Sequence, residues 1–248
     1  MAGRAVLVTG ASRGIGRAIA RAFAVAGDRV AVHYGRSPAE AERTREGLPG
    51  RGHVLVGADL ADPRAVRRMV DEAAASLHGL DVVVNNGGVY VEHPVTETSY
   101  EEWQQAWRHT LDVNLVGAAN VTWCAVRHMR RGGRIVNVSS RGAFRGEPDH
   151  PAYGASKAGL NAFAGSMARA LAPRGIAVST VAPGFVETDM TAAALHGAGG
   201  VRIRAQSPFD RTGRPAEVAA AVLYLASPEA EYASGTVLDL NGASHLRG

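Results

Sequence analysis

The sequence has little cysteine, little lysine and no long apolar stretch. Its 248 residues include one cysteine, Cys124, which excludes an intrachain disulfide and leaves no cysteine cluster for zinc. No apolar run approaches the roughly 18 residues of a membrane helix, and no signal peptide precedes the first strand pattern, so we expect no membrane contact and a cytoplasmic location. The nine histidines form no H-E-x-x-H pattern, so we expect no metal site.

Aromatic residues are also scarce, at 6% of the chain. A surface that binds nucleic acid needs clustered basic residues with aromatic residues between them. The net charge here is +4, and the arginines are spread along the whole sequence. We therefore expect no nucleic-acid partner.

Short runs rich in Val and Ile alternate with longer helical patterns. The expected strands are residues 5–9, 29–34, 53–57, 81–85, 134–139, 176–181 and 236–240. The expected helices are residues 14–26, 38–48, 63–77, 100–129, 151–172 and 215–226. This alternation predicts an α/β fold, a doubly wound parallel sheet of seven strands with helices on both faces. No Pro/Ser-rich linker divides the chain, so we expect residues 1–248 to form one domain.

Residues 187–215 break the alternation. They follow a central strand and are rich in Ala and Gly. Such a segment is typical of a substrate lid, and a surface loop without a function would have the same composition.

The only lysine of the chain, Lys157, lies four residues after Tyr153, while all other basic side chains are arginines. Positions i and i+4 share one face of a helix, so the ammonium is expected beside the phenol. A nearby cation lowers the pKa of a phenol, which is otherwise about 10. Tyr153 is therefore a candidate general acid/base. Chance placement is the alternative, so the pair needs support from other residues.

A glycine-rich turn follows the first expected strand, with the spacing Gly10-x3-Gly14-x-Gly16. Gly10 permits a tight turn, Gly14 lets the backbone approach a pyrophosphate, and Gly16 lets the helix and the strand pack closely. The N–H groups at the helix start attract an anion. A purely structural turn is the alternative, and the strand–turn–helix context favours a dinucleotide site.

The end of the second expected strand indicates which dinucleotide is bound. A site for NAD places an Asp or Glu here, which accepts hydrogen bonds from the ribose hydroxyls. This sequence has Arg36 and Ser37 instead, and Arg13 can approach from the glycine-rich turn. Two guanidiniums and a hydroxyl suit a 2′-phosphate, so we predict NADP(H). The alternative is that Arg36 is only a solvated loop residue.

These motifs resemble those of the short-chain dehydrogenases/reductases over almost the whole chain. The resemblance implies a Rossmann-type fold. It also implies that Asp59-Leu60 contacts adenine, and that Asn85-Asn86-Gly87-Gly88 corresponds to the family's Asn-Asn-Ala-Gly. Gly87 stands where Ala is usual, and we expect the structure to be looser there.

The resemblance implies an active site of four residues. Asn114 matches the family's helix Asn, and Ser140, thirteen residues before Tyr153, matches its active-site Ser, with the adjacent Ser139 as the alternative. In the implied mechanism, Ser140 stabilises the substrate carbonyl oxygen and Tyr153 protonates it. Lys157 lowers the pKa of Tyr153 and binds the nicotinamide ribose. Asn114 holds a water that returns protons to Lys157.

The segment 183–188, Pro-Gly-Phe-Val-Glu-Thr, resembles the family's segment that receives the nicotinamide carboxamide. The motifs together define the positions that we expect to contact the cofactor. They are Gly10, Ser12, Arg13, Gly14, Ile15, Gly16, Arg36, Ser37, Asp59, Leu60, Asn86, Gly87, Gly88, Tyr153, Lys157, Pro183, Gly184, Val186 and Thr188.

Within the family, the C-terminal part is most similar to the 3-oxoacyl-(acyl-carrier-protein) reductases. The similar segments are residues 183–190, 205–208, 211–215 and 240–242. The similarity implies NADPH-dependent reduction of a 3-oxoacyl thioester in a homotetramer. It also implies a possible acyl-carrier-protein partner, held by Arg131 and Arg174 near the mouth of the active site. The alternatives are a ketoreductase of secondary metabolism, a sugar or polyol dehydrogenase and a non-enzymatic dinucleotide sensor.

Overall fold

A computed structural model of the chain describes residues 3–189, 191–195 and 197–247. Seven parallel strands form one sheet in the order β3-β2-β1-β4-β5-β6-β7. The strands are β1 (Ala5–Val8), β2 (Arg29–Tyr34), β3 (Val54–Gly57), β4 (Leu80–Asn85), β5 (Met129–Val138), β6 (Ala177–Pro183) and β7 (Val237–Leu240). The strand order reverses between β1 and β4, which is where doubly wound sheets bind ligands. The predicted seven-stranded parallel sheet is confirmed.

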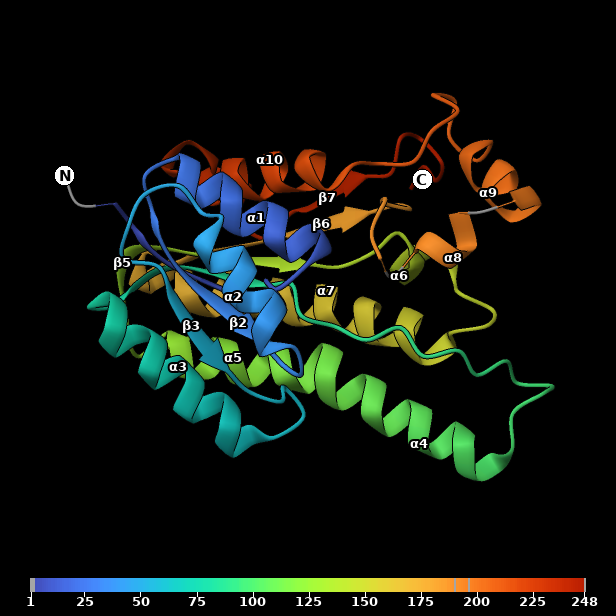
Figure 1. The fold of residues 1–248 in the computed structure, drawn as a ribbon, viewed down its shortest axis with the longest axis horizontal. Helices are drawn as coiled ribbons and strands as arrows, with labels where there is room; N and C mark the ends of the chain where they lie inside the picture. Colours follow the sequence, from blue (N-terminus) through green and yellow to red (C-terminus); the bar gives the residue numbers. More distant parts are fainter. Residues whose placement is uncertain (1–2, 190, 196, 248) are drawn as a thin grey trace.

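Helices cover both faces of this sheet; Figure 1 shows α3, α4 and α5 below it and α10 at the top. The helices are α1 (Gly14–Val25), α2 (Pro38–Glu46), α3 (Pro63–Leu77), α4 (Tyr100–Leu111), α5 (Gly117–Ala125), α6 (Gly142–Arg145), α7 (Pro151–Leu171), α8 (Ala192–Leu195), α9 (Gly197–Arg204) and α10 (Pro215–Leu225). Proline opens α2, α3, α7 and α10, a position where its missing N–H costs no hydrogen bond.

The strand side chains alternate between two hydrophobic cores. Val6 and Val8 belong to one core together with Phe23 of α1, whereas Leu7 belongs to the other core together with Met69 of α3. All of these side chains are buried. Because both faces are covered, consecutive apolar residues such as Val82, Val83 and Val84 of β4 are all buried.

The predicted helix over residues 100–129 is wrong as a single element. A π-helical turn, Asp112–Val116, separates α4 from α5, and α5 ends at Ala125. The N–H of Gly117 bonds to the carbonyl of Asp112 five residues earlier, so one extra residue is inserted into the helical ladder. The inserted turn holds Asn114. The following strand also starts earlier than predicted, at Met129, and its pairing with β4 shifts register between Leu80 and Val82.

Two short helices, α8 and α9, lie within the predicted lid over residues 187–215. Figure 1 shows them beyond the sheet on the same side as α6, which follows the carboxyl end of β5. An isolated bridge between Val186 and Gly213 joins the two ends of this segment. Met190 and His196, which belong to the predicted lid, lie outside the described residues.

Two further observations hold for the part of the chain that the structure describes. No helix there is long and apolar enough to cross a membrane. No group of three or more His, Cys, Asp or Glu side chains there is arranged to hold a metal ion.

Candidate active site

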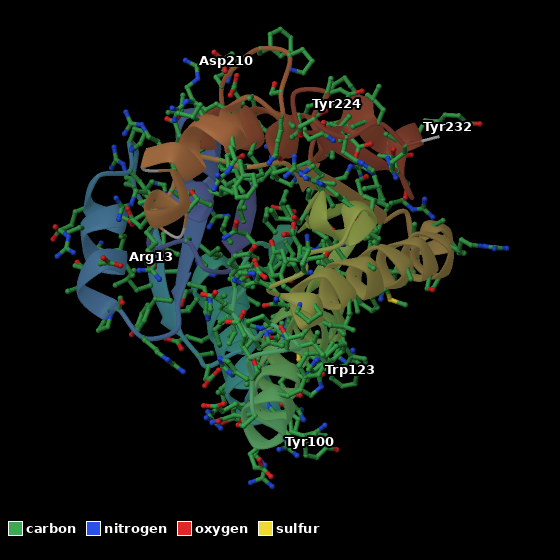
Figure 2. All side chains as sticks on the ribbon, turned by 90° about the vertical axis from the view of Figure 1, so that its right-hand side faces the viewer. Arg13, Tyr100, Trp123, Asp210, Tyr224 and Tyr232 are labelled. Atoms are coloured by element: carbon green, nitrogen blue, oxygen red, sulfur yellow. The ribbon has the colours of Figure 1, made fainter. Side chains whose placement is uncertain are left out.

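A cavity of about 410 Å³ opens at the carboxyl ends of the strands. Figure 2 looks onto this end of the molecule. Every position that the sequence analysis assigned to the cofactor lines this cavity, and so does Ser140. Asn114 is the one predicted site residue that does not line it. The motifs, which are spread over most of the chain, therefore converge on one site.

The glycine-rich turn forms one end of the cavity, and its geometry requires glycine. Gly10 has a φ of +62°, and a Cβ atom there would lie 2.8 Å from Cα of Gly87. A Cβ atom on Gly16 would lie 2.1 Å from the carbonyl oxygen of Gly10. Any larger residue would push the turn away from its neighbours, so the backbone stays open to a ligand.

Two side chains hold this turn in place. Nδ1 of His33 accepts the N–H of Gly10 at 2.9 Å, while its Nε2 lies 3.0 Å from the carbonyl oxygen of Ala58. Burial lowers the pKa of His33 to about 4, so the ring is neutral at neutral pH and can accept this bond. The amide of Asn86 donates to the carbonyl oxygens of Thr9 and Gly10 at 2.9 and 3.1 Å. The sequence analysis missed His33, whose only signal was its place near the end of a strand beside the turn.

Arg13 and Arg36 lie on the rim of the cavity at this end. Both side chains are exposed, and within the described residues neither forms a salt bridge. Figure 2 shows Arg13 beside the N-terminal part of the ribbon. Ser37 lines the cavity next to Arg36. This rim therefore presents two guanidiniums and one hydroxyl to the cavity.

Gly87 does not loosen the structure as expected. A Cβ atom on Gly87 would lie 2.7 Å from Cδ1 of Leu60. The Leu60 side chain therefore takes the space that an alanine methyl group would need. The neighbouring Asp59 also lines the cavity, and its carboxylate accepts the N–H of Ala61 at 2.9 Å.

Ser140, Tyr153 and Lys157 meet at the other end of the cavity. The Ser140 hydroxyl lies beside the Tyr153 phenol and accepts the N–H of Gly142 at 3.0 Å. Nζ of Lys157 lies 5.7 Å from the centre of the Tyr153 ring. Ser139 is buried and donates to the carbonyl oxygen of Lys157, so Ser140 is the serine that faces Tyr153.

The electrostatics of this group differ from the expectation that Lys157 lowers the pKa of Tyr153. Burial raises the pKa of Tyr153 to about 12, although the Ser140 hydroxyl acts in the opposite direction. Burial lowers the pKa of Lys157 to about 8. Nζ of Lys157 donates to the carbonyl oxygen of Val138 at 2.8 Å. The expected lowering of the Tyr153 pKa is therefore absent from this arrangement, in which burial is the largest cause acting on the phenol and Lys157 is not among the causes.

Asn114 is buried, at 1% exposure, and ties three elements together. Its Oδ1 accepts the N–H of Val89 at 2.8 Å, and its Nδ2 donates to the carbonyl oxygen of Val89 at 3.0 Å and to Ser156 at 3.2 Å. This side chain thus joins the loop after β4 to α7, which carries Tyr153 and Lys157. Its expected role in holding a water stays a prediction.

Thr188 lies directly beside the glycine-rich turn. A Cβ atom on Gly14 would come within 3.3 Å of Cγ2 of Thr188. The backbone N–H of Thr188 donates to the Thr191 hydroxyl at 3.1 Å, which fixes the start of the segment that leads to α8. The sequence analysis did not identify Thr191, which also lines the cavity.

The sequence analysis also missed an aromatic cluster at Tyr153. The Tyr90 ring stacks on His150, with ring centres 3.6 Å apart, and meets the Tyr153 ring edge-on at 4.7 Å. The Tyr90 hydroxyl donates to Glu147 at 3.4 Å. No motif marks Tyr90, Glu147 or His150, so only the structure brings them together.

Arg131 and Arg174 do not lie near the mouth of this site within the chain. Arg131 is near the start of β5, before Arg134, where the regular pairing of β5 with β4 and β6 resumes and runs on toward Val138. Arg174 precedes β6, and the carbonyl oxygen of Gly175 accepts the N–H of Gly132. Both arginines are therefore at the amino edge of the sheet, opposite the cavity, and the expected position is wrong for a single chain.

Comparisons with known proteins agree with this geometry. The family model described as enoyl-(acyl carrier protein) reductase matches residues 10–245. The 3-oxoacyl-(acyl-carrier-protein) reductase FabG of Vibrio cholerae is 38% identical over 247 residues, which are 98% of each chain. The crystal structure of a short chain dehydrogenase from Burkholderia cenocepacia in complex with NADP has a TM-score of 0.90 at 36% identity, covering 98% of each chain. The short-chain dehydrogenase/reductase SDR:glucose/ribitol dehydrogenase from Brucella melitensis has a TM-score of 0.90 at 28% identity, covering 98% of this chain and 97% of that one.

The chain belongs to the short-chain dehydrogenase/reductase family. The resemblance stated from its motifs is thereby confirmed, and the protein is an oxidoreductase of that family. The relatives differ in the substrates that their names state, so the substrate has to be argued from the site.

Proposed function

We propose that this protein is an NADPH-dependent ketoreductase, that Tyr153 is its proton donor, and that its substrate is a 3-oxoacyl thioester. One observation carries the proposal: a single cavity has two exposed guanidiniums at one end and the Ser140–Tyr153–Lys157 group at the other. The similarity to 3-oxoacyl-(acyl-carrier-protein) reductases supports the choice of substrate.

The residues at the first end fit an NADP(H) molecule. The glycine-rich turn leaves no room for side chains, so a pyrophosphate can reach the N–H groups at the start of α1. Arg13, Arg36 and Ser37 would hold the 2′-phosphate, since two guanidiniums and a hydroxyl can donate several charge-assisted hydrogen bonds. An NAD-specific site would need a carboxylate at the end of β2, and none stands there.

The residues at the second end fit a carbonyl reduction. NADPH, when bound, supplies the hydride that reaches the carbonyl carbon. Ser140 donates a hydrogen bond to the carbonyl oxygen and stabilises its developing negative charge. Tyr153, whose pKa of about 12 keeps it protonated at neutral pH, gives its proton to that oxygen. Lys157, whose pKa of about 8 leaves it mostly charged at neutral pH, is proposed to bind the ribose hydroxyls of the nicotinamide.

The segment over residues 187–215 is proposed as the substrate lid. Val186 and Thr188, which precede α8, line the cavity. Movement of α8 and α9 would change access to Ser140 and Tyr153 without disturbing the sheet. Asn114 is proposed to hold a water that returns protons to Lys157, since Asn114 Oδ1 and Lys157 Nζ both lie close to Gly88.

We propose a homotetramer, as the family resemblance implies, with contacts through α4, α5, α7 and β7. Trp123, which follows α4 on α5, is exposed and labelled in Figure 2. An acyl carrier protein is a possible partner. Because Arg131 and Arg174 lie opposite the cavity, they could serve a carrier only at another subunit's site. Light scattering of the purified protein tests the assembly.

A sugar or polyol dehydrogenase is the second candidate function, since one structural relative is described as a glucose/ribitol dehydrogenase. The test measures the turnover of each compound in a substrate panel by the change in NADPH absorbance. It includes a 3-oxoacyl thioester, an enoyl thioester, simple ketones, and glucose or ribitol with NADP⁺. We expect the highest kcat/KM with the 3-oxoacyl thioester and a preference for NADPH over NADH. Turnover of the polyols alone would favour the second candidate, and no turnover with any compound would favour a dinucleotide sensor.

A further inference from the structure

Tyr90 connects the catalytic candidate Tyr153 to a carboxylate from another segment. Its ring meets the Tyr153 ring edge-on, at 88° and 4.7 Å between ring centres. Its other contacts are the stacked His150 ring at 3.6 Å and the Glu147 carboxylate, which accepts its O–H at 3.4 Å. Tyr90 follows β4, whereas Glu147 and His150 precede Tyr153 on the segment between α6 and α7. One side chain thus touches both the proton donor and an acid.

The fold makes a specific place for this acid. A Cβ atom on Gly142 would lie 2.5 Å from Oε1 of Glu147 and 2.8 Å from its Cγ. Only a glycine at position 142, two residues after Ser140, leaves room for the carboxylate. Glu147 is half-buried, so its charge is screened less than that of a surface acid.

The charged groups around Glu147 act in both directions. Arg141 and Arg145, at α6, favour its ionised form, and so does the hydrogen bond from Tyr90. Burial and Asp149 favour the neutral form, and burial is the largest cause of the raised pKa of Glu147.

The imidazole beside this carboxylate does not cancel its charge. Burial lowers the pKa of His150, the partner of Tyr90 in the stack, so that ring is neutral at neutral pH. The charge of Glu147 therefore acts on Tyr153 without a histidine cation between them.

We propose that Glu147, held in place by Tyr90, biases the enzyme toward carbonyl reduction at high pH by disfavouring the Tyr153 phenolate. In reduction, the phenol O–H bond breaks and an O–H bond forms on the product alcohol, while hydride forms the new C–H bond. In alcohol oxidation, the phenolate must take up that proton. A negative charge nearby disfavours the phenolate, and Glu147 is indeed among the causes of the raised pKa of Tyr153. This inference rests on the proposed function.

The test compares pH profiles of kcat for reduction and for oxidation. Glu147→Gln removes the charge and keeps the shape, and Glu147→Ala removes both. In the parent, kcat for reduction falls and kcat for oxidation rises as the pH passes the pKa of Tyr153. We expect both of these changes to occur about one pH unit lower in both variants, which is the size of the effect that one nearby charge exerts. Tyr90→Phe keeps the charge and should shift the profile less. Glu101→Gln, at an exposed position on α4, is the matched control and should leave the profile unchanged.

The outcomes separate this inference from the proposed function. If the parent reduces no carbonyl compound, or if Tyr153→Phe remains active, the proposed function fails. If the parent is active through Tyr153 but the profiles of both Glu147 variants superpose on its own, the function stands and the bias by Glu147 is refuted. A shift in Glu147→Ala that Glu147→Gln lacks would also refute it, because such a shift would come from packing and not from charge.

Discussion

The two ends of the cavity use different physical means. The glycine-rich end relies on backbone geometry and on the exposed cations of Arg13 and Arg36. The reaction end relies on buried ionisable groups, where burial raises the pKa of Tyr153 to about 12 and lowers that of Lys157 to about 8. Exposed charge suits recognition of an anion, which must enter from water. Buried groups with shifted pKa values suit proton transfer.

The largest effect should come from Tyr153→Phe, which removes only the phenolic oxygen. We expect kcat to fall by about 1,000-fold, since a positioned proton donor typically contributes 10²–10⁴-fold. NADPH binding should change little, because the anion-binding residues lie at the other end. Absorbance assays measure turnover, and fluorescence titration measures the Kd for NADPH. Near-normal turnover would remove Tyr153 from the mechanism.

Lys157→Arg keeps the charge at the reaction end but should still lower kcat by about 100-fold, because a planar guanidinium replaces a compact ammonium. Lys157 is 4% exposed and bonded to Val138. A Cβ atom on Gly88 would lie only 3.7 Å from Nζ, so the site has little room for a larger group. A pH–rate profile of the variant distinguishes the effect of moving the charged group from the effect of the charge itself. A profile and kcat equal to those of the parent would contradict the role of a buried ammonium.

Arg36→Ala probes the glycine-rich end. Loss of one charge-assisted contact should raise the Kd for NADPH by about 10-fold and leave that for NADH nearly unchanged. Arg13→Ala should raise the Kd for NADPH in the same way. Arg43→Ala, on the neighbouring helix α2, is the control and should leave it unchanged. Titrations at two salt concentrations sharpen the result, since the loss should be smaller at high salt. An equal loss for both dinucleotides would show that Arg36 does not read the 2′-phosphate.

The sequence predicted the glycine-rich end better than the reaction end. Gly10 and Arg36 lie in local motifs whose spacing fixes their geometry, and both line the cavity. The contact of Tyr90 with Glu147 joins residues 57 positions apart, so no local pattern carries it. The pKa of Tyr153 was misjudged for a related reason. Helical spacing places Lys157 nearby, but burial and the bond to Val138 depend on the whole packed site.

The smallest expected effect is a pH-dependent change in stability that comes from His33. This residue is a buried ionisable group, like those of the reaction end, but it supports the glycine-rich end. The folded chain holds the pKa of His33 at about 4, below its usual 6.5, so the unfolded chain binds more protons as the pH falls from 6.5 toward 4. As the pH falls from 7.5 to 5.5, His33 should therefore lower the free energy of unfolding of the parent by about 1 kcal/mol. The variant His33→Gln should lose less over that interval, although it is less stable at pH 7.5. Urea unfolding at both pH values measures the difference, and equal losses in parent and variant would mean that His33 is already protonated in the folded state.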